Sequence, residues 1–436
     1  MTETINIFWF RRDLRLDDNV GLYHALQSEH PVLPIFIFDK EILESLQKDD
    51  ARVTFIHETI SKINSNLKEE INSSIITYYG NPLDVFKKLV TTYSIDTVYT
   101  NHDYEPYAIK RDKDVKQFLK TKNIEIKSYK DQVIFETNEI TKDDGLPYKV
   151  YTPYSKKWIE ALKHNPIKIC DSKDLLKNLF KTSNLPFLTL NDIGFIKSNQ
   201  KIEPCDTSES LINQYEATRN FPNEDGTSKL GPHLRFGTVS VRKMVQKGFK
   251  SNNITFLKEL IWREFFMQIL WHFPHTITKS FKPKYDNIQW RNNQEEFKAW
   301  CEGKTGYPLV DAGMRELNQS GFMHNRVRML VGSFLCKHLL IDWRLGEAYF
   351  AEKLHDYEMA SNIGNWQWVA GCGVDAAPYF RIFNPTTQIQ KFDKDLKYIK
   401  KWVPDLQELT YPQPIVEHKF ARERCLNSYK EALNNF

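Results

Sequence analysis

The sequence predicts an α/β amino-terminal domain with a parallel, five-stranded, doubly wound sheet, followed by an all-α carboxyl-terminal domain. Three observations lead to this fold class. Short apolar runs alternate with helix-like segments over about the first 130 residues. From about Thr207 the recurring pattern is helical, and no strand pattern of comparable strength occurs. A chain of 436 residues also exceeds one comfortable hydrophobic core, so two domains are expected.

The predicted strands of the first domain are short and apolar. They cover Ile5–Phe10, Val32–Phe38, Ile75–Tyr79, Asp96–Thr100 and Ile124–Ile126, with helices such as Ala51–Leu67 and Pro82–Thr92 between them. Such a sheet carries helices on both faces and binds ligands at the carboxyl ends of its strands. The sequence contains no G-x-G-x-x-G or Walker loop there, so the usual dinucleotide and nucleotide triphosphate fingerprints are missing.

Two segments of the first half have no regular periodicity. The charged run Phe10–Asn19 follows the first strand and, taken alone, reads as a loop whose arginines pair with the neighbouring aspartates. Residues 131–204 are rich in Pro, Lys, Asn and Ser, which is typical of a long connector. Tyr151–Tyr154 and Trp158 are candidates to anchor that connector. The predicted domain limits are therefore 1–130 for the α/β domain, 131–204 for the connector and 205–436 for the helical domain.

Four helices of the second domain are predicted with most weight. They cover Leu257–Trp271, Leu309–Gln319, Asn325–His338 and Arg344–Leu354, and the first of them reads as a strong amphipathic helix.

Composition narrows the class of protein. From Cys205 onward the chain has 31 Lys and Arg against 26 Asp and Glu, a net +5 within a total of +4, and eight of the ten tryptophans fall there too. Basic surface with aromatic side chains suits nucleic acid, although charge runs are usually solvated faces.

The six scattered cysteines form no CxxC pair, so we expect reduced thiols, no disulfide framework and no metal site. No signal peptide or membrane-length apolar run is present, and we expect a cytoplasmic protein.

The segment Asp356–Trp368 is the densest chemical pattern in the chain. Asn362 and Trp366 are four residues apart and share a helix face, and the run 371–388 that follows is rich in aromatic and amide side chains. This suits a planar aromatic cofactor better than hydrolytic chemistry, and an aromatic core helix is the alternative. Upstream, Gly226–Gly237 supplies hydroxyls, amides and cations that suit a pyrophosphate, or else it is a loop with a helix cap.

Two more groups share helix faces. Glu259, Trp262 and Arg263 place a carboxyl, an indole and a guanidinium where they can bind a flat polar base, the alternative being a core tryptophan beside a surface Glu–Arg pair. Asn325 and Met329 share a face next to Arg328, or begin a solvated basic helix. Three further tryptophans have no spacing relation and are more often core residues than an electron path; they are Trp290, Trp343 and Trp366.

Taken together, these stretches resemble the DNA photolyase/cryptochrome family over nearly the whole chain, most closely the bacterial photolyases of cyclobutane pyrimidine dimers. The resemblance rests on five ordered motifs: Trp9–Arg15, Thr305–Ala312, Gly321–Arg326, Asn365–Trp368 and Phe383–Gln388. It implies a carboxyl-terminal helical domain that holds a U-shaped FAD, active as FADH⁻, and an amino-terminal antenna domain. The missing glycine fingerprint then makes sense, because helices hold this flavin.

The resemblance also implies roles for individual residues. Asn362 is expected to face flavin N5, and Arg328 is expected to pair with Asp356 beside the ring. The residues expected to contact the cofactor are Tyr215, Thr227, Ser228, Lys229, Leu230, Gly231, Phe256, Arg263, Arg328, Asp356, Glu358 and Asn362. An electron path is expected to run through Trp366, Trp343 and Trp290.

The implied reaction is light-driven repair of cyclobutane pyrimidine dimers in DNA, in which excited FADH⁻ gives one electron to a flipped-out dimer. Damage weakens stacking, so extruding the dimer costs less than extruding normal bases. Glu259 is expected to hydrogen-bond the base edge of the dimer. The residues expected to contact DNA are Arg219, Trp262, Asn325, Arg326, Met329, Trp368, Arg381 and Gln388. We expect a monomer that needs no metal.

Departures from the family pattern leave some points open. Phe322 stands where many relatives carry tryptophan, Glu358 where many carry Asp, and Gly231 replaces a common Ser. The segment Tyr104–Ala108 lacks the Asn-Glu pair of folate-binding relatives, so a second, antenna chromophore can be a folate, a deazaflavin, a flavin or none.

Other functions weighed are a cryptochrome photoreceptor, a (6-4) photolyase and a generic flavin oxidoreductase. Asn362 favours repair, because many cryptochromes carry Asp or Cys there, and we expect no signalling tail beyond Phe436. The (6-4) mechanism is linked to two pocket histidines, whereas here Asn325 and Met329 follow His324. An oxidoreductase is disfavoured by the absence of any nicotinamide fingerprint.

Overall fold

The structure is a computed structural model that describes residues 3–182 and 185–434. These residues group into two compact units, each described by itself. The sheet unit comprises Met1–Glu136, Leu162–Cys205 and Leu230–Lys247, and the helical unit comprises Thr137–Ala161, Asp206–Lys229 and Gly248–Phe436. This grouping follows contacts within the chain and does not show which segments fold separately. The domain limits at residues 130 and 204 therefore stay predictions.

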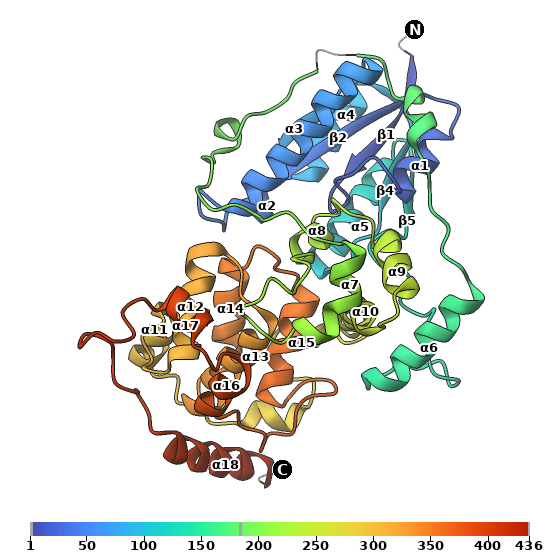
Figure 1. The fold of residues 1–436 in the computed structure, drawn as a ribbon. Coiled ribbons are helices and arrows are strands. Elements are labelled where there is room, and N and C mark those ends of the chain that lie inside the picture. Colours follow the sequence, from blue (N-terminus) through green and yellow to red (C-terminus); the bar gives the residue numbers. More distant parts are fainter. Residues whose placement is uncertain (1–2, 183–184, 435–436) are drawn as a thin grey trace. The chain divides into compact units, whose positions relative to one another are not determined.

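The sheet unit contains the predicted five-stranded parallel sheet (Figure 1). Its strands are β1 (Thr4–Phe10), β2 (Val32–Asp39), β3 (Ile76–Gly80), β4 (Ser94–Asn101) and β5 (Glu125–Tyr129). They pair in the order β3-β2-β1-β4-β5, every pair being parallel. Each observed strand overlaps its predicted range, so the predicted fold class is confirmed.

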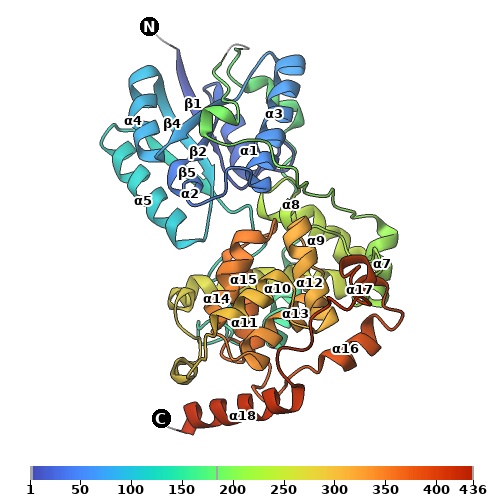
Figure 2. The same cartoon turned by 90° about the vertical axis from the view of Figure 1, so that its left-hand side faces the viewer.

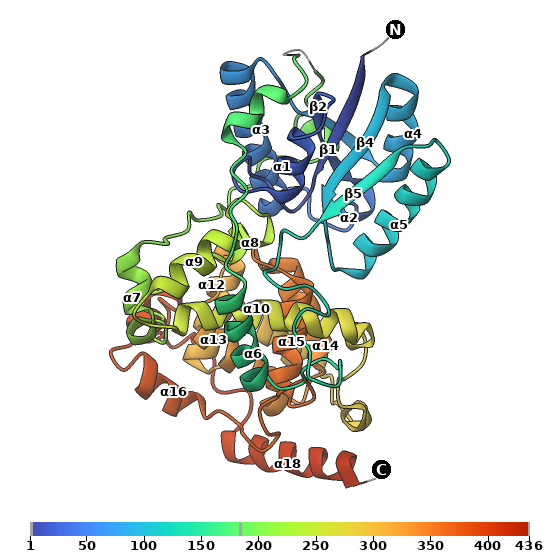
Figure 3. The same cartoon turned by 90° about the vertical axis from the view of Figure 1, so that its right-hand side faces the viewer.

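Helices cover both faces of this sheet, as the doubly wound pattern requires (Figures 2 and 3). Phe8 and Phe10 of β1 point to the face covered by α1 (Val20–Leu26) and α3 (Ala51–Ile71), whereas Ile7 and Trp9 point to the face covered by α4 (Pro82–Thr92) and α5 (Pro106–Lys120). Side chains of a buried parallel strand are apolar on both faces, which explains the continuous apolar runs in the sequence.

Part of the predicted connector belongs to the sheet unit. The backbone N–H of Phe180 donates to the carbonyl of Val32 at 2.8 Å, and Leu176, Leu179 and Phe195 are buried in the core beside α3. The other helical elements of this unit are α2 (Lys40–Leu43), α8 (Gly231–Arg235), the first part of α9 (Val241–Lys250) and short 3₁₀ turns at Lys173–Asn178 and Asn191–Ile193. This segment therefore adds to the core instead of passing over it as a free linker.

The interpretation of Phe10–Asn19 as a locally paired loop is wrong. Arg11 binds Asp112 at 2.5 Å, and Arg12 contacts the carboxylates of Asp103 and Glu105 at 3.2 and 3.1 Å. These partners lie about a hundred residues away in the chain, at or after the carboxyl end of β4. The arginines thus fasten the loop after β1 to the loop after β4 and to α5, which sequence distance alone conceals.

A buried ion network lies next to this loop. Arg15 donates to Asp131 at 2.7 Å, and Arg242 donates to the same carboxylate at 2.8 Å and to Asp18 at 3.0 Å. All four side chains are nearly inaccessible to solvent. Burial works to raise the pKa of Asp131, but the charges of Arg15 and Arg242 outweigh it and hold that pKa below its ordinary value.

The helical unit contains helices and, among its described residues, no β-strand. Its helices are α6 (Tyr151–His164, whose end lies in the sheet unit), α7 (Glu209–Thr218), α10 (Thr255–His272), α11 (Gln294–Glu302), α12 (Pro308–Ser320), α13 (Asn325–Ser333), α14 (Trp343–Lys353), α15 (Met359–Ala370), α16 (Pro385–Phe392), α17 (Lys397–Trp402) and α18 (His418–Asn434). None of the helices described is long and apolar enough to cross a membrane.

Two helix predictions need correction. The helix over Leu257–Trp271 exists as α10, but its polar and apolar residues are not separated onto two opposite faces, because neighbouring helices bury it on several sides. The predicted helix Asn325–His338 changes character at Ser333, where α13 ends and one π-helical turn, Phe334–His338, continues the chain. A π-turn adds a residue per turn, which a regular period cannot reveal.

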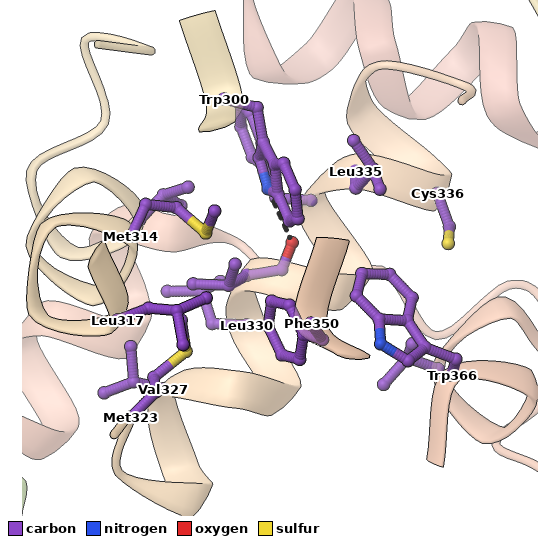
Figure 4. Packing of buried hydrophobic residues seen from close by; sticks show 14 of the residues in the cluster. Trp300, Met314, Leu317, Met323, Val327, Leu330, Leu335, Cys336, Phe350 and Trp366 are labelled. Atoms are coloured by element: carbon purple, nitrogen blue, oxygen red, sulfur yellow. Dashed lines mark hydrogen bonds between the residues drawn. The ribbon is translucent and has the colours of Figure 1, made fainter. Parts of the chain in front are cut away.

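The core of the helical unit is built around tryptophan (Figure 4). Trp300 is fully buried, and its Nε1 donates to the carbonyl of Val331 at 3.2 Å. Its ring meets Trp366 edge-on with centroids 6.1 Å apart, and Phe350 packs against both rings. This cluster joins α11, α14 and α15 to one another.

We predict that Asp131→Asn destabilises the protein by about 3–5 kcal/mol, because it leaves buried arginines without a countercharge. The free energy of unfolding from urea denaturation measures the loss. Asp114→Asn, on the exposed face of α5, is the matched control and should leave the midpoint where it is. Equal midpoints for the two variants would contradict the role given to the network.

Candidate functional site

Most of the predicted site residues lie on helices of the helical unit that touch one another. Helix α10 contacts α7 and α15, and α13 also contacts α15. Helix α10 carries Phe256, Glu259, Trp262 and Arg263; α13 carries Asn325, Arg326, Arg328 and Met329; α15 carries Asn362, Trp366 and Trp368, and Glu358 is its N-cap. Segments far apart in the sequence therefore converge on α15.

Close packing fixes the position of α15. A Cβ added to Gly346 of α14 would lie 2.2 Å from the ring of Trp366, and one added to Gly364 would lie 2.2 Å from the ring of Phe266 on α10. Neither contact is possible for a larger residue without a shift of an aromatic ring, since such rings are packed at near-crystalline density. Glycine at both positions lets the two neighbouring helices approach α15.

Asn362 is oriented by a single neighbour, Glu347 of α14. Its Nδ2 donates to the backbone carbonyl of Glu347 at 3.0 Å and to the carboxylate Oε1 at 2.9 Å. Because a backbone carbonyl only accepts, the amide cannot be flipped without losing this bond. Burial raises the pKa of Glu347, and the bond from Asn362 offsets this in part. The described hydrogen bonds leave Oδ1 of Asn362 as an acceptor for another molecule.

Two arginine–carboxylate pairs flank the start of α15. Arg328 binds both oxygens of Asp356, at 3.1 and 2.9 Å, in a bidentate arrangement. Arg263 donates to Glu358 at 2.9 Å, and the carboxylate of Glu358 also accepts from Ser361 at 3.3 Å. The structure thus brings together the predicted pair Arg328 and Asp356. The side chain of Glu358, which is longer than the Asp of many relatives, reaches Arg263.

Glu259 and Arg219 form an ion pair at the other end of this site. The guanidinium of Arg219 also lies 5.3 Å from the ring centre of Tyr215, so these three predicted residues are together. Burial, followed by the charge of Glu259, raises the pKa of Tyr215 to about 12. The alternative of a surface pair between Glu259 and Arg263 is wrong, because each of the two binds a partner outside α10.

Arginines gather beside this pair. Arg326 donates to the side-chain oxygen of Asn220, and its guanidinium lies 4.6 Å from the ring centre of Phe392. Burial and the nearby charges of Arg219 and Arg381 lower the pKa of Arg326. Such crowding of cations is unfavourable without an anion, so the cluster is suited to a phosphate.

Trp262 is held by a residue that sequence reasoning treated only as an anchor. The ring of Tyr151 stacks on Trp262 with centroids 3.7 Å apart and planes within 6°. The Tyr151 hydroxyl donates to the carbonyl of Lys258 at 2.8 Å, one turn before Trp262 on α10. The two residues are 111 positions apart, so no periodic pattern signals the stack; the aromatic cluster at Tyr151–Tyr154 is the only hint.

The three tryptophans of the predicted electron path belong to one core. Trp366 and Trp343 are buried, and Trp290 packs against the same cluster while partly exposed. Their burial also satisfies the alternative of simple core packing, so the path stays a prediction. Sequence reasoning missed Trp300, whose ring contacts Trp366 directly (Figure 4).

The loop Gly226–Lys229 has an unusual backbone. Lys229 has a φ of 50°, in the left-handed region that costs a non-glycine residue conformational energy, and its ammonium lies 3.3 Å from Asp225. Ser228 is buried, and its carbonyl accepts the N–H of Asp206 at 3.0 Å. Thr227 directly precedes Ser228. Leu230 and Gly231 follow the loop and belong to the sheet unit, where Gly231 begins α8.

The remaining predicted DNA contacts are more dispersed. Asn325 and Arg381 are exposed, and Met329 accepts a hydrogen bond from Arg326 at 3.5 Å. The carbonyl of Arg381 accepts from the buried ammonium of Lys337 at 2.8 Å, which anchors that loop. Trp368 packs partly against the core, and Gln388 lies in α16. Among the described contacts, none joins Gln388 to another predicted site residue.

Models of two protein families match this chain. The model of the FAD binding domain of DNA photolyase matches residues 256–410, and the DNA photolyase model matches residues 6–171. The deoxyribodipyrimidine photo-lyase of Agrobacterium fabrum is 37% identical to the chain, over 97% of each protein, and that of Escherichia coli is 33% identical, over 98% of the chain and 99% of the relative. This chain belongs to the DNA photolyase family.

Solved photolyase structures agree with this assignment. A bacterial class III photolyase from Agrobacterium tumefaciens superposes with a TM-score of 0.84 at 33% identity, covering 100% of this chain and 98% of its own. An archaeal photolyase from Sulfolobus tokodaii, solved with two FAD molecules, gives 0.82 at 33% identity, covering 98% and 99%. A Synechocystis cryptochrome with 24% identity shares the fold.

The residues that converge on α15 fit the flavin that a photolyase FAD-binding domain takes. The Oδ1 of Asn362 is a neutral acceptor, fixed in direction, and it matches the N–H that a reduced flavin carries at N5. The same domain model spans Phe256, Arg263, Arg328, Asp356, Glu358 and Asn362, which are six of the predicted cofactor residues.

We predict that Asn362→Asp lowers the reduction potential of the bound flavin by about 30 mV or more. A carboxylate there repels the negative charge of the reduced flavin, and 30 mV corresponds to roughly 1.4 kcal/mol for two electrons. Reduction and reoxidation spectra of the flavin-loaded protein measure the shift. Asn365→Asp, exposed on the same helix, is the control, and identical potentials in wild type and Asn362→Asp would refute the role of Asn362.

Proposed function

We propose that this photolyase uses blue light to repair cyclobutane pyrimidine dimers in DNA. The observation that carries the proposal is Asn362, locked by Glu347 with its amide oxygen available, at the centre of a chain related over its full length to deoxyribodipyrimidine photo-lyases. A neutral amide contacts the reduced flavin without adding a titrating group. The reaction is carbon–carbon bond cleavage, so the enzyme is a lyase.

The chain's own residues would hold and orient FAD. Arg328 with Asp356 and Arg263 with Glu358 provide fixed charges beside Asn362, and Lys229 with Ser228 is the group proposed for the phosphates. When bound, the reduced flavin supplies the electron that light releases. The protein contributes binding, orientation and electrostatics at this site.

The lesion is proposed to enter where Arg219 and Glu259 now pair. Glu259 then exchanges Arg219 for the base edge of a dimer that is flipped out of the duplex, and Arg219 becomes available to a phosphate together with Arg326 and Arg381. Trp262, held flat by Tyr151, and Trp368 are proposed as apolar walls, with Met329 on the floor. Of the remaining proposed contacts, Asn325 begins α13 and Gln388 lies within α16.

The fold does not distinguish a photolyase from a cryptochrome photoreceptor, because a cryptochrome has the same fold. What favours repair is the asparagine at 362, together with the absence of a second pocket histidine where Asn325 and Met329 follow His324, which disfavours (6-4) chemistry. We also infer a cytoplasmic monomer; sedimentation of the purified protein tests the monomer, and fractionation of cells tests the location. The antenna domain is proposed to hold a folate, a deazaflavin, a flavin or no second chromophore, and absorption of the heat-released chromophores distinguishes these cases.

The deciding experiment illuminates the reduced, flavin-loaded protein with an oligonucleotide that contains one thymine dimer. We expect dimer loss that depends on light and on reduction, while a (6-4) oligonucleotide in a parallel reaction stays unchanged. A dark reaction is the control. Intact thymine dimers after illumination would overturn the proposal, and repair of the (6-4) oligonucleotide instead would transfer it to the other photolyase class.

A companion arm examines the tryptophan path. In Trp366→Phe we expect slower photoreduction of oxidised flavin but ordinary repair by protein that was reduced beforehand, because the path serves only to refill the cofactor. Trp402→Phe, at the end of α17, is the control. Wild-type photoreduction in Trp366→Phe would exclude this residue from the path.

We predict that Trp262→Ala weakens binding of dimer-containing DNA by about 5- to 150-fold, the equivalent of losing one base-stacking contact of roughly 1–3 kcal/mol. Titration of a labelled duplex in the dark, at one stated salt concentration, measures it. Trp271→Ala removes a more exposed tryptophan at the end of the same helix and should change affinity little. Equal losses in both variants would show a general effect on α10 and not a pocket wall.

A further inference from the structure

A second group of reactive side chains lies in the sheet unit, on its edge strand. His102 follows the carboxyl end of β4, and Ser128 lies in β5, which is the last strand of the sheet (Figure 3). The Nε2 of His102 is 2.9 Å from Oγ of Ser128, and its Nδ1 bonds Oε1 of Glu136. The Tyr104 hydroxyl donates to the same carboxylate oxygen at 2.7 Å. None of these residues takes part in the site proposed for flavin or DNA.

The order serine, imidazole, carboxylate is that of an activated nucleophile. Burial works to raise the pKa of Glu136, but hydrogen bonds from His102 and Tyr104 outweigh it and keep that pKa below its ordinary value. An ionised Glu136 accepts a proton-bearing Nδ1, so in neutral His102 the Nε2 is the acceptor and faces the Ser128 hydroxyl. The carboxylate thus sets the tautomer that a general base needs.

The backbone holds this arrangement in place. The N–H of His102 donates to the carbonyl of Tyr129 at 2.7 Å, which extends the β4–β5 pairing by one residue, and the carbonyl of His102 accepts from Gln132 at 2.9 Å. His102 is therefore fixed on both sides of its Cα. Only rotation of the His102 side chain could then change its distance to Ser128. Both ring nitrogens of His102 are in hydrogen bonds, which oppose such a rotation.

The nucleophile is accessible. Ser128 is exposed, and the side chains of His102 and Glu136 are 34% and 24% exposed, so a small molecule can reach the hydroxyl. The carbonyl of Tyr129 points toward β4, and neighbouring peptide groups in a strand point to opposite sides, so the N–H of Ser128 faces away from the sheet. An outward N–H on the nucleophile itself is a donor for an oxyanion that forms there.

We propose that Ser128, His102 and Glu136 form a second, light-independent site that cleaves small activated carboxylic esters by acyl transfer. The Ser128 oxygen bonds the ester carbonyl carbon while its proton passes to Nε2 of His102. The ester C–O bond then breaks, and the alcohol leaves with that proton. Water adds to the acyl carbon with His102 as base, the Ser128–acyl bond breaks, and a carboxylic acid and free serine result, with no change of oxidation state.

The test uses the full-length, flavin-loaded protein in the dark. A fluorophosphonate, which reacts only with activated serines, is expected to add once per chain, on Ser128 by peptide mass spectrometry, and p-nitrophenyl acetate is expected to be hydrolysed catalytically. Ser128→Ala should abolish the adduct. His102→Gln should slow its formation by about 100-fold or more, the range of general-base assistance. Glu136→Gln, which keeps the shape but removes the charge, should also slow it.

The matched control is Ser94→Ala, which removes another exposed serine of the sheet unit, whose hydroxyl lies 3.3 Å from that of Thr4 and not beside a histidine. It should label like wild type. Repair of thymine dimers by Ser128→Ala, assayed on the same samples, shows that this variant is folded. No adduct on wild type, or the same adduct in Ser128→Ala, would overturn the proposal, as would labelling of His102→Gln at the wild-type rate.

Discussion

The close packing of α15 between α10 and α14 is the constraint on which the proposed photochemistry depends. Gly346 and Gly364 leave no room for a side chain, and the ring of Trp366 fills the space between α14 and the core. Because α15 cannot rotate, Asn362 keeps its amide against Glu347, and its oxygen points in one direction. The helix that is proposed to tune the cofactor is thus also the helix that begins the proposed electron path, so packing at Gly346 should affect both.

Charge is used differently in the two units. In the sheet unit, arginines are matched by carboxylates from distant segments, as with Arg15 and Arg242 around Asp131, and the result is a buried, self-satisfied network. In the helical unit, Arg219 pairs with Glu259, whereas burial and the charges of Arg219 and Arg381 lower the pKa of Arg326. The first arrangement stabilises a loop, whereas the second is suited to an anion from outside the chain.

Periodicity was enough to predict the sheet and the main helices, since a buried parallel strand and a helix face leave direct traces in the order of apolar residues. Ordered motifs were enough to place the candidate site on α10, α13 and α15. Periodicity failed for α10, because burial on several sides erases the amphipathic pattern. Partners far apart in the chain were also out of reach. Tyr151 stacks on Trp262 across 111 positions, and the pairing of Asn362 with Glu347 depends on how α14 meets α15.

The crowded arginine at position 326 links recognition to the folding equilibrium. Burial and the charges of Arg219 and Arg381 disfavour the charged form of Arg326 by lowering its pKa, and a ligand that brings negative charge would favour that form. Undamaged duplex, which presents the same phosphates as damaged duplex, would therefore already raise the melting temperature of the protein. Scanning along intact DNA would then keep the enzyme in its more stable form. The lesion would have to add only the contacts that distinguish damaged from undamaged DNA.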